Sequence, residues 1–428
     1  MGDTIMKTKE PFIGFILVFL ILLFGYFYLQ NDMLFFRLMM GCTLGYALSR
    51  GYMGFAGSVN RAYLTGSTRL MRTLMLLFFI SAAGSLAVLF HADATSFGLW
   101  VNPINLGLLL GGILFGVGMA FSSCCASGVL TDLVTALPRA LVTLIFFCAG
   151  VFLGFPIQNT ASWIQESWFT TKTGAAIGTK GVYLPDLFEF DGLNGYLGAL
   201  LVTAAFCLLV VRLSYAYENK HKKEGTYKQH FEEGIQKKVV EEQLNEKDTP
   251  LFSPKGYERF FVRPWTLKTS IFVISIVFIL LMGVTKEGWG ASTPYGFWFG
   301  KLLMIFGVSA EKIAQFTHGS PKPYILAFFR HPVTLQNVGI LLGTAFYLLT
   351  AGQLIQTAKA SFHITKKQAF FYALGGFCMG FGTRLSNGCN VGALYTPIAN
   401  FSLSGWIFLI VLVIGGYWGN QVAHKVNL

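Results

Sequence analysis

LGGILFGVGMAFSSCCASGVL at residues 110–130 and LGGFCMGFGTRLSNGCNVGAL at residues 374–394 align without a gap. Both follow the pattern L-G-G-x3-G-x-G-x3-S-x2-C-x2-G-x-L, so glycines, a serine and a cysteine recur at the same spacings. Weaker copies begin at Gly41 and Gly339, with glycine where the cysteine would fall. An internal repeat of this kind indicates two related structural units within the chain.

Each full copy has the features of a membrane-spanning helix that breaks before a short second helix. The glycines would allow another helix backbone to approach closely. The run then meets Ser, Asn, Gly and Cys, which continue a helix poorly, before short helices expected at 126–136 and 391–398. Such a break is tolerated at membrane depth only where it lines a cavity or is buried in protein.

The composition favours lipid as the solvent. The 428 residues are 54% hydrophobic and only 12% charged, whereas soluble domains carry about 25% charged residues. The formal net charge of +12 does not indicate nucleic-acid binding, because Lys and Arg lie mostly in short connections between apolar runs. The seven cysteines, several of them inside apolar runs, do not resemble a secreted disulfide framework.

The apolar runs predict an all-α polytopic membrane protein with about ten transmembrane helices plus short re-entrant half-helices. A span needs about 20 predominantly apolar residues. Suitable runs occur at 11–29, 34–49, 70–90, 104–121, 138–155, 193–215, 267–284, 333–350, 368–385 and 403–420. The stretch 295–308 is apolar but short and is interrupted by Lys301, so we expect it to be interfacial or re-entrant.

A charged segment divides the chain into two membrane halves, 1–216 and 264–428. Residues 217–263 are rich in Lys and Glu, and we expect them to form a cytoplasmic linker that acts as a tether. The positions of the basic residues place this linker and both termini in the cytoplasm. The five basic residues of the 285–332 connection conflict with this orientation. With it, the two full copies run in opposite directions as two inverted pseudo-repeats.

The cysteines that begin the two half-helices are the candidate substrate site. Cys125 and Cys389 are expected near mid-membrane, where free N–H groups and the helix dipole favour an anion. A thiol is polarizable and a weak donor, which suits a soft, sulfur-bearing anion. Neutral polar side chains complete the site: Ser122, Ser123, Ser386, Asn387 and Asn390. Arg384 has two open interpretations, attraction of the anion at an outer mouth or extension of the side chain to the interface.

The remaining candidates indicate packing or topology. Arg139, which follows a proline at the start of a span, is expected to be a topology anchor, and Asp132 lies near the same break. The seven His show no metal-ligand spacing, and no dinucleotide or Walker motif occurs, so we expect neither a metal nor a cofactor. The cysteines interpreted as packing residues are Cys42, Cys148, Cys207 and Cys378, while Cys124 is left open.

At these motifs the sequence resembles the YeeE/YedE family of bacterial inner-membrane proteins, whose characterised members take up thiosulfate. RLSNGCNVGALYTPIANFSL at 384–403 is particularly similar to family members, and the resemblance covers both halves but not the linker. It implies an hourglass-shaped pathway of spans and half-helices, in which Cys125 and Cys389 relay the substrate. A further cysteine of the family falls at Gly54 of this chain.

The resemblance therefore implies a transporter rather than an enzyme, which takes up a small sulfur-containing anion, thiosulfate first, by relay along mid-membrane cysteines. Gly54 leaves a different sulfur or selenium compound open. The alternatives are a membrane thiol–disulfide oxidoreductase, for which the chain lacks a C-x-x-C motif, and a passive channel or structural partner. The expected partners are the anion, the lipid bilayer and a cytoplasmic sulfur-carrier protein, but no nucleic acid.

Overall fold

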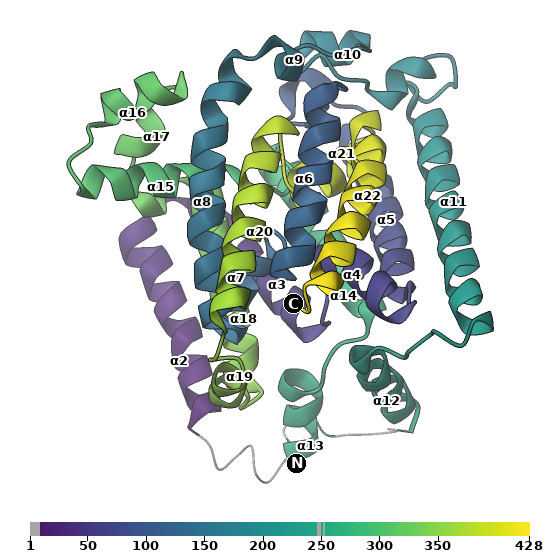
Figure 1. The fold of residues 1–428 in the computed structure, drawn as a ribbon, viewed down its shortest axis with the longest axis vertical. Coiled ribbons are helices and arrows are strands. Elements are labelled where there is room, and N and C mark those ends of the chain that lie inside the picture. Colours follow the sequence, from purple (N-terminus) through teal and green to yellow (C-terminus); the bar gives the residue numbers. More distant parts are fainter. Residues whose placement is uncertain (1–8, 246–249, 251–252) are drawn as a thin grey trace.

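The computed structural model describes residues 9–245, 250 and 253–428, and within these residues every regular element is a helix. The axes of most long helices are roughly aligned in Figure 1, with α2 (Glu10–Leu23) and α11 (Tyr196–Lys223) at opposite margins. We call the lower end in this view, which carries α12 (Phe231–Asn245) and α13 (Pro254–Tyr257), the linker end. The far end carries α9 (Ser162–Gln165) and α10 (Lys172–Ala176).

All ten predicted spans coincide with helices, which confirms an all-α polytopic membrane protein. Besides α2, which the π-helix η1 (Phe24–Leu29) continues, and α11, they are α3 (Asp32–Arg50), α5 (Arg69–Leu89), α6 (Leu106–Ser122), α8 (Leu137–Thr160), α14 (Leu267–Thr285), α18 (Pro332–Thr350), α20 (Lys366–Leu385) and α22 (Leu403–Lys425). Among the described residues, seven helices are long and apolar enough to cross a membrane by length and composition. Of the other three, α6 is shorter, whereas α3 and α20 are long enough but less apolar.

Short helices connect or interrupt the spans. The predicted half-helices are present as α7 (Gly128–Thr135) in the first copy and as η6 (Asn390–Tyr395) with α21 (Thr396–Ala399) in the second. The helix α15 (Thr293–Ile305) lies across the direction of the long helices in Figure 1, so 295–308 is not a further parallel span. The remaining short helices are α4 (Phe55–Thr65), α16 (Ala310–Thr317), α17 (Lys322–Ile325), α19 (Leu354–Ala360), η2 (Ala94–Ser96), η3 (Leu184–Leu187), η4 (Glu258–Val262) and η5 (Phe328–Arg330).

The two full sequence copies meet as an antiparallel pair, α6 against α20. A Cβ atom added at Gly111 would lie 2.6 Å from the carbonyl oxygen of Gly382, and one at Gly118 would lie 2.5 Å from that of Gly375. Only glycine permits this backbone approach. Because Gly111 corresponds to Gly375 and Gly118 to Gly382, the repeat exchanges the two contacts, which confirms that the copies are inverted.

Another glycine of each copy packs against the helix that follows the opposite copy. A Cβ at Gly116 would lie 2.6 Å from the amide nitrogen of Gly416 in α22, and one at the equivalent Gly380 would lie 2.9 Å from that of Val151 in α8. The order α8–α20–α6–α22 therefore repeats the same close packing about the central pair. Side chains larger than hydrogen at these glycines would separate the helices that hold the two cysteine motifs.

The charged segment 217–263 contains a helix that packs against the bundle. Its helix α12 packs on the linker end, where the Nε2 atom of Gln236 donates to the carbonyl oxygen of Trp265 at 2.7 Å. The Oε1 atom of the same side chain accepts from the amide of Leu267, at the start of α14, at 3.0 Å. Part of the segment is thus a docked helix rather than a solvated chain.

Candidate functional site

Two cavities enter the bundle, each beside one sequence copy. The Arg384 cavity, of about 530 Å³, is lined by Arg384, Asn387 and Gly388 of the second copy and includes Asn159 from the far-end part of α8. The Cys125 cavity, of about 560 Å³, is lined by Ser123, Cys124 and Cys125 of the first copy and includes His230 and Glu232 from the linker. The two cavities thus approach the bundle core from opposite ends.

Cys125 lies in the break between α6 and α7. The chain turns at Ser123, which has a left-handed φ of 55° and faces the Cys125 cavity. Cys125 is buried, with its Sγ atom 3.5 Å from the Oγ atom of Ser127. Cys124, which the sequence left open, also lines this cavity. The first copy therefore presents two thiols and one exposed hydroxyl to the same space.

Cys389 occupies the equivalent break before η6. Asn387, the counterpart of Ser123, has nearly the same left-handed φ, 56°. The side chain of Cys389 is fully buried, whereas the neighbouring Asn387 and Gly388 line the Arg384 cavity. In both copies, the residue two positions before the cysteine has a left-handed φ and lines one of the two cavities.

Ser122 and Ser386 also have matched environments, but their hydroxyls are occupied. Ser122 Oγ donates to the carbonyl oxygen of Gly118 at 2.8 Å, and Ser386 Oγ donates to that of Gly382 at 2.8 Å. These bonds to the preceding helical turn are common for serine in helices. The two side chains support the ends of α6 and α20, while Ser123 and Asn387 face the cavities.

The two asparagines of the second copy differ in their surroundings. The Oδ1 atom of Asn387 accepts from the Nε2 atom of Gln158 at 2.7 Å at the surface of the Arg384 cavity. Asn390 is completely buried, and its Nδ2 atom lies 2.9 Å from the Sδ atom of Met119 in α6. Among the described residues, the Oδ1 atom of Asn390 has no hydrogen-bond partner. Since buried polar atoms are normally paired, Asn390 keeps a polar atom available beside Cys389.

Arg384 is buried in the last turn of α20 and lines a cavity rather than extending to the membrane surface. Its guanidinium donates to the Oγ atom of Ser292 at 3.1 Å and to the Oε1 atom of Gln158 at 3.4 Å. It also lies over the ring of Phe155, 5.3 Å from its centroid. Across residues 9–245, 250 and 253–428, no carboxylate lies within ion-pairing distance. The buried positive charge therefore suits an anion in this cavity.

The basic residues of the Cys125 cavity, in contrast, are paired with carboxylates. Arg139, interpreted above as a topology anchor, forms an ion pair of 2.8 Å with Asp132. Arg61 of α4 pairs with Glu232 of α12. Burial raises the pKa of Glu232 to about 7, while Arg61 lowers it and Glu233 raises it. This cavity therefore holds less uncompensated positive charge than the Arg384 cavity.

Arg61 and Glu232 line the Cys125 cavity but were not predicted as site residues. The charge pattern of 217–263 resembles that of any solvated segment, so it does not indicate which side chain docks against the membrane part. Residues at the breaks of the two full copies line the cavities. The position of Arg61, just after the weaker copy that begins at Gly41, was therefore a signal that it could line a cavity too.

A buried layer separates the two cavities. The helix α15 begins at Thr293, which lines the Arg384 cavity, and two residues later the hydroxyl of Tyr295 donates to the carbonyl oxygen of Ala126 at 2.5 Å. The Tyr295 ring is fully buried and packs edge-on against Phe147, with the centroids 5.1 Å apart. The first turn of α15 thus joins the wall of one cavity to the residue beside Cys125.

Comparison with known proteins gives a family match and several relatives. A family described as Sulphur transport matches residues 50–418 of the chain. The thiosulfate transporter TsuA of Spirochaeta thermophila is 23% identical over 385 residues, which cover 89% of this chain and 96% of the relative. The thiosulfate transporter TsuA of Escherichia coli is 21% identical, with 90% and 94% covered. The probable transporter YedE of Escherichia coli is 28% identical over 160 residues, so the match spans only 38% of that relative.

Proposed function

Because the chain belongs to the Sulphur transport family, we propose that it takes up a small sulfur-containing anion, thiosulfate first, across the bacterial inner membrane. In this proposal the linker end, both termini and the segment 217–263 are cytoplasmic, and the Arg384 cavity faces outward. The observation that carries the proposal is the uncompensated, buried Arg384 beside the second cysteine motif. Membership of this family favours transport over the alternative of a thiol–disulfide oxidoreductase.

The contrast in charge between the two cavities favours binding of the anion on the Arg384 side and its release on the other side. Arg384 attracts the anion, while Ser292 and Gln158, which already contact the guanidinium, supply further polar groups. On the other side, Arg61 and Arg139 are paired with carboxylates and attract a released anion less strongly. A site that binds an anion well enough to admit it, but not so tightly as to retain it, favours passage.

Between the cavities, the two cysteines provide weak donors for the desolvated anion. The anion leaves the Arg384 cavity, accepts a hydrogen bond from the Cys389 thiol, and passes to the Cys125 thiol without forming a covalent bond. The Nδ2 group of Asn390, which lies 2.9 Å from the Sδ atom of Met119, donates its second hydrogen beside Cys389. Since Tyr295 and its hydrogen bond to Ala126 close this layer, each transfer requires a movement of the first turn of α15. A cytoplasmic sulfur-carrier protein is the proposed acceptor of the released anion.

The test is uptake of radiolabelled thiosulfate into cells that lack their own thiosulfate uptake and express this chain. Cys389→Ala and Cys125→Ala should each abolish uptake while the protein stays in the membrane. Cys207→Ala is the matched control, since the Cys207 thiol contacts the carbonyl oxygen of Met75, away from both cavities. Normal uptake by both site variants would refute the relay, and no uptake by the parent would refute thiosulfate.

A different sulfur or selenium anion is the second candidate, and Gly54 favours it. Gly54 lines the Cys125 cavity, and a Cβ atom added there would meet nothing within 4 Å. The cavity therefore has free space where the family resemblance places a cysteine, and this space suits a bulkier anion. Competition of unlabelled sulfur and selenium oxyanions against labelled thiosulfate, in the parent and in Gly54→Cys, ranks the substrates. This candidate would be supported if the parent prefers a larger anion and Gly54→Cys reverses that preference.

A further inference from the structure

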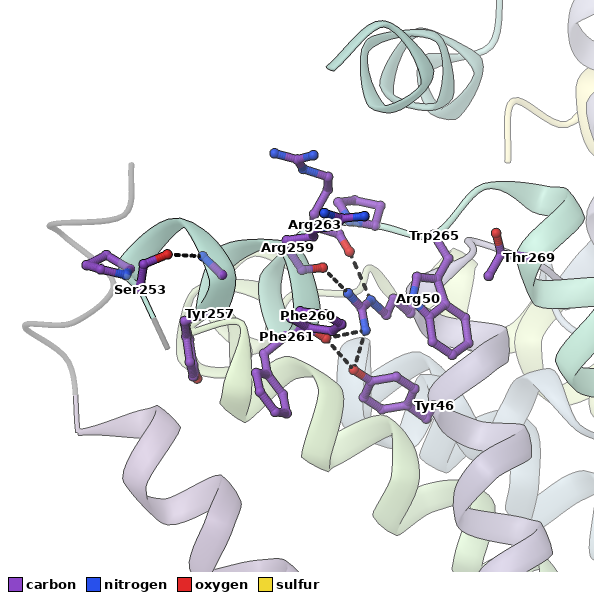
Figure 2. A pocket seen from close by; sticks show the side chains of 13 residues that line it. Tyr46, Arg50, Ser253, Tyr257, Arg259, Phe260, Phe261, Arg263, Trp265 and Thr269 are labelled. Atoms are coloured by element: carbon purple, nitrogen blue, oxygen red, sulfur yellow. Dashed lines mark hydrogen bonds between the residues drawn. The ribbon is translucent and has the colours of Figure 1, made fainter. Parts of the chain in front are cut away.

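A third and larger hollow lies at the linker end, formed by the end of α3, by α13 and η4, and by the start of α14. It is an open groove of about 1010 Å³ (Figure 2). Its lining includes five aromatic residues and three arginines. The aromatic residues are Tyr46, Tyr257, Phe260, Phe261 and Trp265, and the arginines are Arg50, Arg259 and Arg263.

Arg50 holds the groove together. Its side chain is buried and donates to the carbonyl oxygens of Arg259 at 2.9 Å and of Phe260 at 2.6 Å, while its guanidinium lies 4.9 Å from the ring of Trp265. These bonds direct the backbone carbonyls of η4 inward. Figure 2 shows the side chains of Arg259 and Arg263 extending away from Arg50. Arg50 is therefore a structural residue, and Arg259, which is exposed, presents its charge at the rim.

The groove lies at the level where the spans end. The hydroxyl of Tyr257 donates to the carbonyl oxygen of Thr350, the last residue of α18, at 2.7 Å. On its outer side, the ring of Phe261 packs edge-on against Phe15 of α2, with the centroids 5.4 Å apart. Phe15 is exposed on a helix whose apolar side chains face outward. An acyl chain on α2 would therefore reach the aromatic wall directly.

We propose that this groove binds an anionic phospholipid of the cytoplasmic leaflet. Arg259 contacts the phosphate, Arg263 adds positive charge beside it, and an acyl chain lies along Phe261 and Phe15. The segment 253–269 contains four basic residues and one acidic residue, so its charge complements that of the head group. Clusters of basic residues beside cytoplasmic span ends attract anionic lipids, and Tyr and Trp are enriched at this depth. The leaflet assignment rests on the orientation proposed above.

Trp265 gives this proposal a local test. The purified full chain is placed in two kinds of phosphatidylcholine nanodisc. One kind contains phosphatidylglycerol with brominated acyl chains, and the other contains the same amount of phosphatidylcholine with brominated acyl chains. Bromine quenches tryptophan only at short range. Brominated phosphatidylglycerol should therefore quench more than brominated phosphatidylcholine, and Trp265→Phe should remove the difference. The double variant Arg259→Gln with Arg263→Gln should remove it too, with Trp265 unchanged.

The control is Lys359→Gln with Lys366→Gln, which removes two exposed positive charges at the same end but outside the groove. This variant should keep the difference in quenching. Equal quenching by the two lipids in the parent would overturn the proposal. Loss of the difference in quenching in the control variant, to the same extent as in the arginine double variant, would overturn it as well. Competition by inorganic phosphate alone would overturn the lipid assignment in favour of a soluble anion. Because the measurement does not involve uptake, failure here leaves the transport proposal intact, and the reverse also holds.

Discussion

The hydroxyl of Tyr295 donates to the carbonyl oxygen of Ala126 at 2.5 Å, and this bond joins the second membrane half to the cysteine break of the first. The bond is buried and lies between the two cavities. Because its donor belongs to the first turn of α15, which also lines the Arg384 cavity, opening at one side and release of Cys125 at the other are geometrically linked.

Tyr295→Phe should loosen this closure. A buried carbonyl left without its donor costs about 1–3 kcal/mol, which favours conformations in which the layer has moved. We expect faster labelling of Cys125 by a membrane-impermeant thiol reagent applied from the Arg384 side, measured by peptide mass spectrometry. Tyr417→Phe, at an exposed position on α22, is the control. Identical labelling of Cys125 in the two variants would show that the bond does not hold the layer closed.

Arg384→Gln should weaken the entry of the anion. Loss of a charge-assisted interaction costs about 1.5–3 kcal/mol, or about 10- to 150-fold in affinity, so KM for uptake should rise by that factor. Arg384→Lys keeps the charge but loses the planar donor geometry and should fall between. An unchanged KM in Arg384→Gln, with normal amounts of protein in the membrane, would remove Arg384 from the substrate path.

The docking of α12 should depend on pH through Glu232. Its pKa is raised to about 7 when docked, whereas an exposed Glu titrates near about 4.3, so docking takes up a proton between these values. Docking should therefore strengthen as pH falls through about 7 and be weakest above it. Burial lowers the pKa of His230, which acts in the opposite direction.

Hydrogen–deuterium exchange of the 231–241 amides measures this effect. The variant Glu232→Gln keeps His230 and shares the intrinsic pH dependence of exchange, so the ratio of parent to variant isolates Glu232. This ratio should show less protection of the parent at pH 8 than at pH 6. A ratio that stays constant across this range would show that Glu232 does not control the docking.

Gly118→Ala should disturb the central helix pair. The added methyl group would lie 2.5 Å from the carbonyl oxygen of Gly375, and overpacking of this kind costs about 1–3 kcal/mol. We expect a lower Tm of the purified protein and reduced uptake. Gly283→Ala in α14 is the control, because a Cβ atom there meets nothing within 4 Å. Equal Tm values in the two variants would contradict the close packing of α6 on α20.

The sequence was sufficient to predict the spans, the half-helices and the inverted copies, because these depend on local properties. Apolar length defines a span, and residues such as Asn387 and Gly388 end a helix wherever it packs. The choice of neighbours was not predictable in this way. Gly116 and Gly118 lie two residues apart in the same glycine-rich, apolar stretch, yet Gly116 contacts α22 and Gly118 contacts α20.

The roles of polar side chains were predicted only in part. Ser122 and Ser123 are adjacent and chemically identical, but the helical one donates to its own backbone and only the left-handed one faces a cavity. Which occurs depends on the residue at which the helix ends, and a sequence pattern gives that position only within a few residues. The pairing of Arg61 with Glu232 depends on the docking of a distant segment, which no local pattern contains.

The exchange of contacts between α6 and α20 has a consequence for the origin of this architecture. Gly111 meets Gly382 while Gly118 meets Gly375, so each copy offers the other the surface that it receives. A half-length polypeptide inserted in both orientations would make the same contact with a second molecule of itself. The chain thus has the contact geometry of an antiparallel homodimer, but its two copies can differ, as Arg384 does from Ala120 at the equivalent position.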